Sequence, residues 1–225
     1  MKRADAQIVE SYQRLFAAHG YAPKALGWDK GKQFLRFHQL TSNWDLAGAS
    51  ILDVGCGFGD FVDYLRAMNI EGCTYTGIDL VGEFIAEGTR RFGSAKATFR
   101  QTALEDYPPP ATFDYVIASG VFNLRVEGAD GYEEIRRGLT RMFGLSNIAL
   151  SADFISDKVD YAHEHNFNSA PETILSMAYG LSRNVVLRND YFPFEFCVTI
   201  YKDDSFSTNT TTFSATENRL AFLKS

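Results

Sequence analysis

Hydrophobic residues change their spacing along the chain near residue 50. In residues 4–19, apolar side chains recur three and four positions apart, which predicts an amphipathic helix that ends near Gly20. A second helical pattern covers residues 30–40. From residue 50 onward, short apolar runs alternate with amphipathic stretches, which is typical of an α/β fold.

Seven apolar runs are predicted strands, and most are separated by a predicted helix. The strands are expected at residues 50–56, 73–80, 97–103, 113–119, 146–154, 183–189 and 194–202. The helices between them are expected near residues 59–68, 81–92, 131–143 and 171–180. This alternation predicts a Rossmann-like, doubly wound sheet, mostly parallel, with helices on both faces. The last two strands are separated by four residues, 190–193, too few for a parallel crossover, so the last strand must run antiparallel.

The chain has 225 residues, enough for one α/β domain with a sizeable core. We predict a single domain over residues 1–202. Within it, residues 1–45 are expected to form a helical cap or lid, and residues 50–202 a cofactor-binding core. Residues 203–225 are rich in Ser, Thr and Asn and are predicted to be a polar C-terminal extension.

Charge and cysteine content narrow the classes of partner. The formal net charge is −6, with 22 Lys and Arg against 28 Asp and Glu, so the chain has no global attraction for nucleic acid or anionic lipid. Cys56, Cys73 and Cys197 are odd in number and lack metal-ligand spacing, which favours reduced thiols. No membrane-spanning run or signal-peptide core is apparent. We therefore expect a cytoplasmic protein with neither a nucleic-acid nor a membrane partner.

The stretch ILDVGCGFGDF, residues 51–61, places three alternating glycines between a predicted strand and a predicted helix. Glycines at such a junction let a ligand approach the backbone, and the helix start supplies oriented N–H groups. The dinucleotide fingerprint would have its last glycine where this chain has Asp60. Because a carboxylate there would repel a pyrophosphate, the pattern favours a ligand without phosphate.

Asp79 ends the second predicted strand, 20 residues beyond Gly59. A carboxylate at this position can accept hydrogen bonds from both hydroxyls of an adenosine ribose. An adenosine without phosphates fits S-adenosylmethionine, which is therefore the predicted cofactor.

At this point the sequence resembles the class I S-adenosylmethionine-dependent methyltransferases, in their small-molecule group. Their first motif, D/E-x-G-x-G-x-G, is matched by Asp53, Gly55, Gly57 and Gly59. The resemblance covers roughly residues 50–202 and includes the antiparallel last strand. It implies transfer of a methyl group to an oxygen of a small metabolite, with nitrogen as the weaker alternative.

The resemblance also implies roles for individual residues. It places the first two glycines under the methionine and ribose, Asp79 at the ribose, and residues 102–104 around the adenine, although Thr102 stands where the family often has an acidic residue. It implies a lid over residues 26–37 that reaches the cofactor carboxylate. The implied cofactor-binding residues are Asp53, Gly55, Gly57, Gly59, Asp79, Leu80, Thr102, Ala103, Leu104, Ser119, Gln33, Arg36 and Trp28.

The acceptor pocket is expected at the carboxyl ends of the strands, in the loops 119–130 and 155–170. In the second loop, His163 and His165 are candidates for a general base, because histidine titrates near neutral pH. A solvated pair of surface histidines is the alternative interpretation, and Asn123 is a further candidate.

The residues at the end of the fourth predicted strand and just after it disfavour two kinds of methyltransferase. Ser119 stands where catechol-type methyltransferases place a metal-binding Asp, so no metal is expected. Residues 119–122 also differ from the N-P-P-Y-like motif of enzymes that methylate base amines. A small-molecule acceptor remains as the predicted partner.

Two other functions remain open at this stage. An NAD-dependent oxidoreductase of Rossmann type is disfavoured by Asp60 and by the antiparallel last strand. A catalytically inactive module that binds S-adenosylmethionine would keep Asp79 and the glycines, and the sequence does not separate it from an enzyme.

Overall fold

The computed structural model describes residues 3–26, 32–108 and 112–203. Two helices, α1 (Arg3–His19) and α2 (Gln33–Thr41), precede the sheet, with the short 3-10 helix η1 (Pro23–Leu26) between them. The predicted extension from residue 204 onward and the predicted lid residue Trp28 lie outside the described residues.

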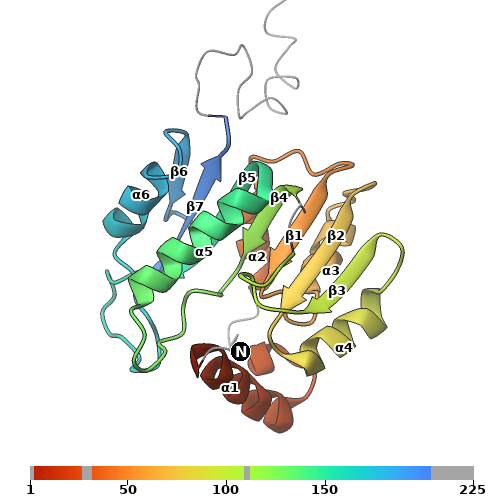
Figure 1. Ribbon diagram of the computed structural model, residues 1–225, viewed down its shortest axis with the longest axis horizontal. Helices are drawn as coiled ribbons and strands as arrows, with labels where there is room; N and C mark the ends of the chain where they lie inside the picture. Colours follow the sequence, from red (N-terminus) through yellow and green to blue (C-terminus); the bar gives the residue numbers. More distant parts are fainter. Residues whose placement is uncertain (1–2, 27–31, 109–111, 204–225) are drawn as a thin grey trace, which may run out of the picture.

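A seven-stranded sheet forms the centre of the molecule, in the order β3-β2-β1-β4-β5-β7-β6 (Figure 1). The strands are β1 (Ser50–Val54), β2 (Thr74–Asp79), β3 (Ala97–Gln101), β4 (Phe113–Ala118), β5 (Ser146–Ile155), β6 (Val185–Arg188) and β7 (Glu195–Tyr201). The first five strands pair in parallel, whereas β7 runs antiparallel to both β5 and β6. The predicted doubly wound sheet with an antiparallel last strand is therefore confirmed.

Helices cover both faces of this sheet. They are α3 (Asp60–Ala67), α4 (Gly82–Phe92), α5 (Gly131–Leu145) and α6 (Pro171–Tyr179). In the view of Figure 1, α5 and α6 lie in front of the sheet, and α2 and α3 lie behind it. The N-terminal helix α1 lies beyond the carboxyl ends of the central strands, at the bottom of that view. It therefore covers the edge of the sheet where ligands of α/β folds bind.

The central strand β1 is buried on both faces, which explains why its sequence is apolar apart from Ser50 at its start and Asp53. Leu52 and Val54 belong to a core cluster with Ile135 and Leu139 of α5. Ile51 points to the other face and belongs to a second cluster, which holds side chains of α2 and α3. The two-residue period of the strand thus feeds two cores, one on each face.

Two contacts attach α2 and the turn that follows it to the sheet. Trp44 stacks on Tyr115 of β4 with ring centroids 4.5 Å apart. Arg36 of α2 donates from Nε and Nη2 to the two carboxylate oxygens of Glu195 in β7, at 2.7 and 2.5 Å. A bidentate pair of this kind fixes orientation as well as distance, so α2 is held in register with the antiparallel strand.

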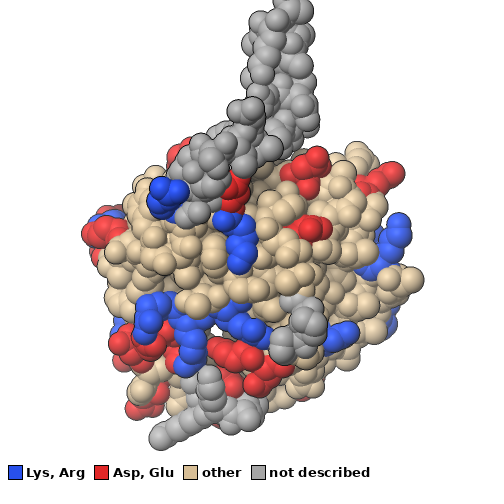
Figure 2. Space-filling view, turned by 45° about the horizontal axis from the view of Figure 1, so that its top comes forward, with Lys and Arg blue, Asp and Glu red and all other residues tan. Residues whose placement is uncertain are grey.

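The surface carries both signs of charge. Figure 2 shows basic and acidic side chains intermixed on the lower half of the visible face, without one broad basic surface there. Within the described residues, no helix combines the length and apolarity needed to cross a membrane.

Gly59, the residue before α3, gives a test of this fold. It has φ +79°, and a Cβ built on it would lie 2.6 Å from an atom of the Phe99 ring. Gly48 has φ +74° with nothing within 4 Å of such a Cβ. Gly48→Ala should therefore cost only the ~1–2 kcal/mol of a left-handed backbone, while Gly59→Ala should cost ~1–3 kcal/mol more from overpacking. Urea denaturation measures both losses, and equal losses would contradict this packing.

Candidate functional site

The glycine turn after β1 is approached closely by side chains from two other segments. Gly55 and Gly57 have φ values of +66° and +52°, a left-handed conformation that favours glycine. A Cβ at Gly55 would lie 2.6 Å from Val121, and one at Gly57 would lie 2.9 Å from Leu26 of η1. The turn therefore needs glycine for its backbone conformation and for the space above it.

Asp79 at the end of β2 is hydrogen-bonded to this turn. Its Oδ2 accepts the N–H of Gly57 at 3.0 Å, and its Oδ1 accepts the N–H of Val81 at 2.9 Å. Burial raises the pKa of this carboxyl, and the backbone hydrogen bonds oppose the rise. An ionised carboxylate has about four acceptor positions. The capacity that the backbone N–H groups leave is available to hydroxyl groups of a ligand.

Four residues stand side by side at the carboxyl edge of the sheet. Register pairs Val54 of β1 with Ile78 and with Ala118, and Ala118 with Ala152 of β5. The next residues along these four strands are therefore neighbours: Asp79, Gly55, Ser119 and Asp153. The parallel sheet thus brings together side chains that are far apart in the sequence.

Asp153 is fully buried under the loop that follows β4. The hydroxyl of Ser119 donates to its Oδ2 at 2.8 Å, and the N–H of Gly120 donates to its Oδ1 at 2.6 Å. Burial raises the pKa of Asp153 to about 6, although both hydrogen bonds lower it. This carboxylate holds the start of the loop against the sheet.

Asp53, inside β1, is a second buried carboxyl. The hydroxyl of Tyr75 donates to its Oδ2 at 2.8 Å. Burial raises its pKa to about 7, Tyr75 opposes the rise and the nearby Asp79 adds to it. A carboxyl group with such a pKa is only partly ionised near neutral pH.

A cavity of about 430 Å³ opens above this edge of the sheet. Its floor is the glycine turn and the ends of β2 and β4, and its walls come from the loop after β3, the loop after β4 and helix α5. Helix α1 and η1 close it from outside through Asp5, Ile8, Tyr12 and Leu26. A concave site of this size is typical of small-molecule binding.

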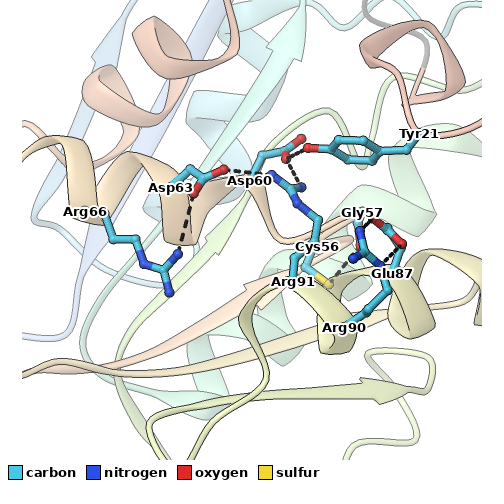
Figure 3. Close-up of polar contacts among 9 residues, drawn as sticks. All are labelled: Tyr21, Cys56, Gly57, Asp60, Asp63, Arg66, Glu87, Arg90 and Arg91. Carbon is cyan, nitrogen blue, oxygen red and sulfur yellow. Dashed lines mark hydrogen bonds and ion pairs between the residues drawn. The ribbon is translucent and has the colours of Figure 1, made fainter.

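An ion-pair network attaches the chain between α1 and η1 to the core (Figure 3). Arg91 of α4 lies 2.8 Å from a carboxylate oxygen of Asp60 and 2.8 Å from one of Asp63. The Tyr21 hydroxyl donates to Asp60 at 3.2 Å, and the Arg91 guanidinium lies 4.3 Å from the centre of the Tyr21 ring. Asp60, which the sequence marked as unfavourable for a pyrophosphate, therefore binds Arg91 and Tyr21 and is not among the residues lining the cavity.

Most of the predicted cofactor-binding residues converge on the cavity. Those that line it are Gln33, Asp53, Gly55, Gly57, Asp79, Leu80, Thr102, Ala103, Leu104 and Ser119. Gly59 packs against Phe99 instead, and Arg36 forms the buried pair with Glu195. The geometry thus separates residues that face the cavity from residues that support them.

The predicted catalytic residues are placed differently. His163 and His165 are exposed, with their rings stacked on each other at 5.5 Å. The side-chain oxygen of Asn123 accepts the N–H of Ile155 at 2.9 Å and braces the loop. None of the three is among the described residues that line the cavity. The loop after β5, which holds both histidines, contributes Phe167 to the lining instead. The base assigned to these residues stays a prediction, without support from their placement.

Sequence reasoning missed some of the site. The cavity-facing residues of α1 were predicted only as part of a general N-terminal cap, whereas Leu26 lies within the predicted lid. Asp153 was not singled out, although a carboxylate inside the apolar run SNIALSADF was a usable signal. A charge within a buried strand requires partners, and such partners often belong to a functional site.

Comparison with known proteins now places the chain in a family. A family model described as a methyltransferase domain matches residues 51–141. A Mycobacterium tuberculosis protein with a provisional methyltransferase name is 30% identical over 159 residues, which is 68% of this chain and 93% of that protein. The chain belongs to the class I S-adenosylmethionine-dependent methyltransferases. S-adenosylmethionine is therefore the cofactor.

Two further proteins extend this comparison. A ubiquinone biosynthesis O-methyltransferase of Pseudomonas syringae pv. tomato is 34% identical over 102 residues, which is 40% of this chain and 42% of that enzyme. The crystal structure of magnesium protoporphyrin IX methyltransferase from Synechocystis PCC 6803, with bound S-adenosylmethionine, superposes with a TM-score of 0.63. It covers 90% of this chain and 99% of that one at 14% identity, so this likeness concerns the fold alone.

The cavity suits the methyltransferase cofactor in its charge. The described residues lining it include one basic side chain, Arg125, and six acidic ones: Asp5, Asp53, Asp79, Glu105, Glu127 and Glu134. A surplus of carboxylates favours a cationic sulfonium over a phosphate-bearing nucleotide. No group of three or more potential metal ligands occurs among the described residues.

The raised pKa of Asp53 predicts how stability depends on pH. An unfolded Asp titrates near pH 4, and the folded carboxyl titrates at about 7. Between these values only the unfolded chain loses the proton, so the free energy of unfolding falls as the pH rises. Asp53→Asn should therefore melt at a higher temperature than the wild type at pH 8, and this advantage should shrink toward pH 4. An advantage of equal size at both pH values, measured by calorimetry, would contradict it.

Proposed function

We propose that this chain methylates a hydroxyl oxygen of a small, largely apolar molecule. The observation that carries the proposal is the composition of the cavity wall beyond Asp79 and the glycine turn. The loop after β4, α5 and the loop after β5 contribute apolar and aromatic residues to that wall, beside the charged Arg125, Glu127 and Glu134: Val121, Phe122, Leu124, Val126, Ile135 and Phe167. A wall of this kind binds a small molecule by contact area and leaves polar groups to set its orientation.

The cofactor is assigned to the opposite part of the cavity. Asp79 would accept the ribose hydroxyls with its remaining acceptor capacity, and Gly55 and Gly57 would allow close approach to the backbone. Leu80 and the side chains of residues 102–104 would surround the adenine. Of the residues expected near the cofactor carboxylate, Gln33 lines the cavity and is retained in this role.

Catalysis in this arrangement depends mainly on positioning. When bound, S-adenosylmethionine supplies a methyl group on a sulfonium, which is a good leaving group. The protein residues hold the acceptor atom within about 3 Å of that methyl and in line with the bond to be broken. Helix α1 and η1 cover the cavity and limit the access of water.

The preference for oxygen rests on two supports. The partly aligned relative from P. syringae is named as an O-methyltransferase. In this chain, the hydroxyl of Ser119 donates to the buried carboxylate of Asp153 beside the glycine turn. Such a pair suits an acceptor that must lose a proton. Nitrogen remains the alternative acceptor.

Asp79→Ala should weaken binding of S-adenosylhomocysteine, the product form of the cofactor. The ribose hydroxyls would lose a charged acceptor in a buried site, an effect of ~2 kcal/mol or more, or about 30-fold in the dissociation constant. Calorimetric titration measures the loss, and circular dichroism checks that the variant is folded. Asp114→Ala is the control, because Asp114 lies at the start of β4, away from the carboxyl edge of the sheet. This variant should bind S-adenosylhomocysteine like the wild type. Unchanged affinity in Asp79→Ala would refute the ribose assignment.

The acceptor itself can be identified by product analysis. The protein is incubated with methyl-labelled S-adenosylmethionine and a fractionated metabolite extract, and labelled products are identified by mass spectrometry. The proposal predicts an O-methyl ether of a small, largely apolar compound. A labelled N-methyl product, or no labelled product from any fraction, would contradict it.

A further inference from the structure

Asp153 is a buried carboxylate that none of the cofactor contacts proposed above uses. It is 2% exposed, and both of its oxygens accept hydrogen bonds from Ser119 and Gly120. Ser119 lines the cavity, whereas Asp153 is not among the described lining residues. Ser119 therefore joins the buried carboxylate, through its hydroxyl, to the lining of the cavity.

The position of Ser119 along the sheet edge places it where the acceptor is expected. It follows β4 and lies next to Gly55, which in turn lies next to Asp79. Because neighbouring strands are about 4.8 Å apart, Ser119 and Asp79 are separated by on the order of 10 Å. If Asp79 holds the ribose, the acceptor is expected on the opposite side of Gly55. Ser119 stands on that side.

Three of the other carboxylates that line the cavity have partners of their own. Glu105 and Glu134 both pair with Arg137, Glu105 at 3.4 Å from its Nε. Asp53 accepts the hydroxyl of Tyr75 within β1, below the glycine turn. The carboxylate under Ser119 differs from these because its side-chain hydrogen-bond donor belongs to a residue that lines the cavity.

We propose that Ser119 and Asp153 form a proton relay that deprotonates a hydroxyl acceptor. This inference rests on the proposed function. As the acceptor oxygen forms its bond to the methyl carbon, the carbon–sulfur bond breaks and its electron pair returns to sulfur. The acceptor proton moves to the Ser119 oxygen while the proton of Ser119 moves to Asp153. The net products are the ether, the thioether and a protonated Asp153, which returns its proton to solvent through Ser119 after product release.

The surroundings of Asp153 suit this role. Burial raises its pKa to about 6, so it is a stronger base than an ordinary Asp and is still mostly ionised at pH 7.5. Charged and titratable groups on three neighbouring segments also influence the pKa of Asp153. The titratable and charged groups that face it are Arg36 of α2, Glu195 and Cys197 of β7, and Tyr191 of the loop before β7.

The test is the pH profile of single-turnover methyl transfer, measured on full-length protein saturated with S-adenosylmethionine and with the hydroxyl acceptor found by product analysis. The wild-type rate should rise with pH and level off above about 6, as Asp153 ionises. Asp153→Asn and Ser119→Ala should each lower the rate at pH 7.5 by about 10² to 10⁴ and lose the rising limb. Ser119→Thr, which keeps a hydroxyl, should restore most of the rate.

Asp114→Asn is a matched control because its carboxylate also accepts one backbone N–H and one hydroxyl, both from Ser50, at 2.8 and 2.9 Å. It should keep the wild-type rate and pH profile. Binding of S-adenosylhomocysteine, measured without acceptor, should change little in Asp153→Asn. A variant that loses this binding but keeps the shape of the pH profile would show a structural role and overturn the relay.

The outcomes separate this inference from the proposed function. An O-methyl ether product together with wild-type rate and pH profile in Asp153→Asn overturns the relay alone. An O-methyl ester overturns both the relay and the proposed hydroxyl acceptor, because a carboxylate acceptor has no proton to lose at neutral pH. A labelled N-methyl product, or no labelled product, overturns the proposed function and the relay with it.

Discussion

Asp79 ends β2 with one carboxylate oxygen on the N–H of Gly57 and the other on the N–H of Val81. These two bonds couple the glycine turn of β1 to the next strand and to the start of α4. Because the turn has left-handed backbone at Gly55 and Gly57, it needs an anchor of this kind to stay in one conformation. Loss of the anchor would disturb the floor of the cavity as well as its ribose contact.

The carboxyl edge of the sheet holds three buried carboxyl groups, which lower the stability of the folded protein. Asp53, Asp79 and Asp153 all have pKa values raised by burial, so each resists ionisation in the folded protein. A core built for stability alone would hold apolar residues at such positions. Their location near one cavity, on β1, β2 and β5, fits a site whose chemistry requires carboxylates.

The fold could be predicted from the sequence because its signals are local. The apolar run at Ile51 and Leu52, the glycine turn and the short hairpin before β7 each fix one feature without reference to distant residues. Asp79 could be assigned for a similar reason, since its distance from the turn reflects one strand–helix–strand unit. These are the parts of the account in which short-range pattern and long-range structure coincide.

The acceptor side could not be predicted in the same way because it is assembled from tertiary contacts. His163 and His165 lie in the expected loop, yet side-chain direction within that loop depends on backbone bridges such as the one between Leu124 and Asn166. Asp153 meets Ser119 only through the register of β4 and β5. Likewise, the pairing of Arg36 with Glu195 joins residues 159 positions apart, and no local pattern indicates it.

The central claim is that Asp79 recognises the ribose hydroxyls, and a thermodynamic cycle tests it most directly. Calorimetry would compare S-adenosylhomocysteine with its 2′,3′-dideoxy analogue on the wild type and on Asp79→Ala. The account predicts that removing the hydroxyls weakens binding to the wild type by about tenfold or more, ~1.4 kcal/mol, and has little effect on the variant. Equal losses on both proteins would show that the hydroxyls bind elsewhere and would contradict the account.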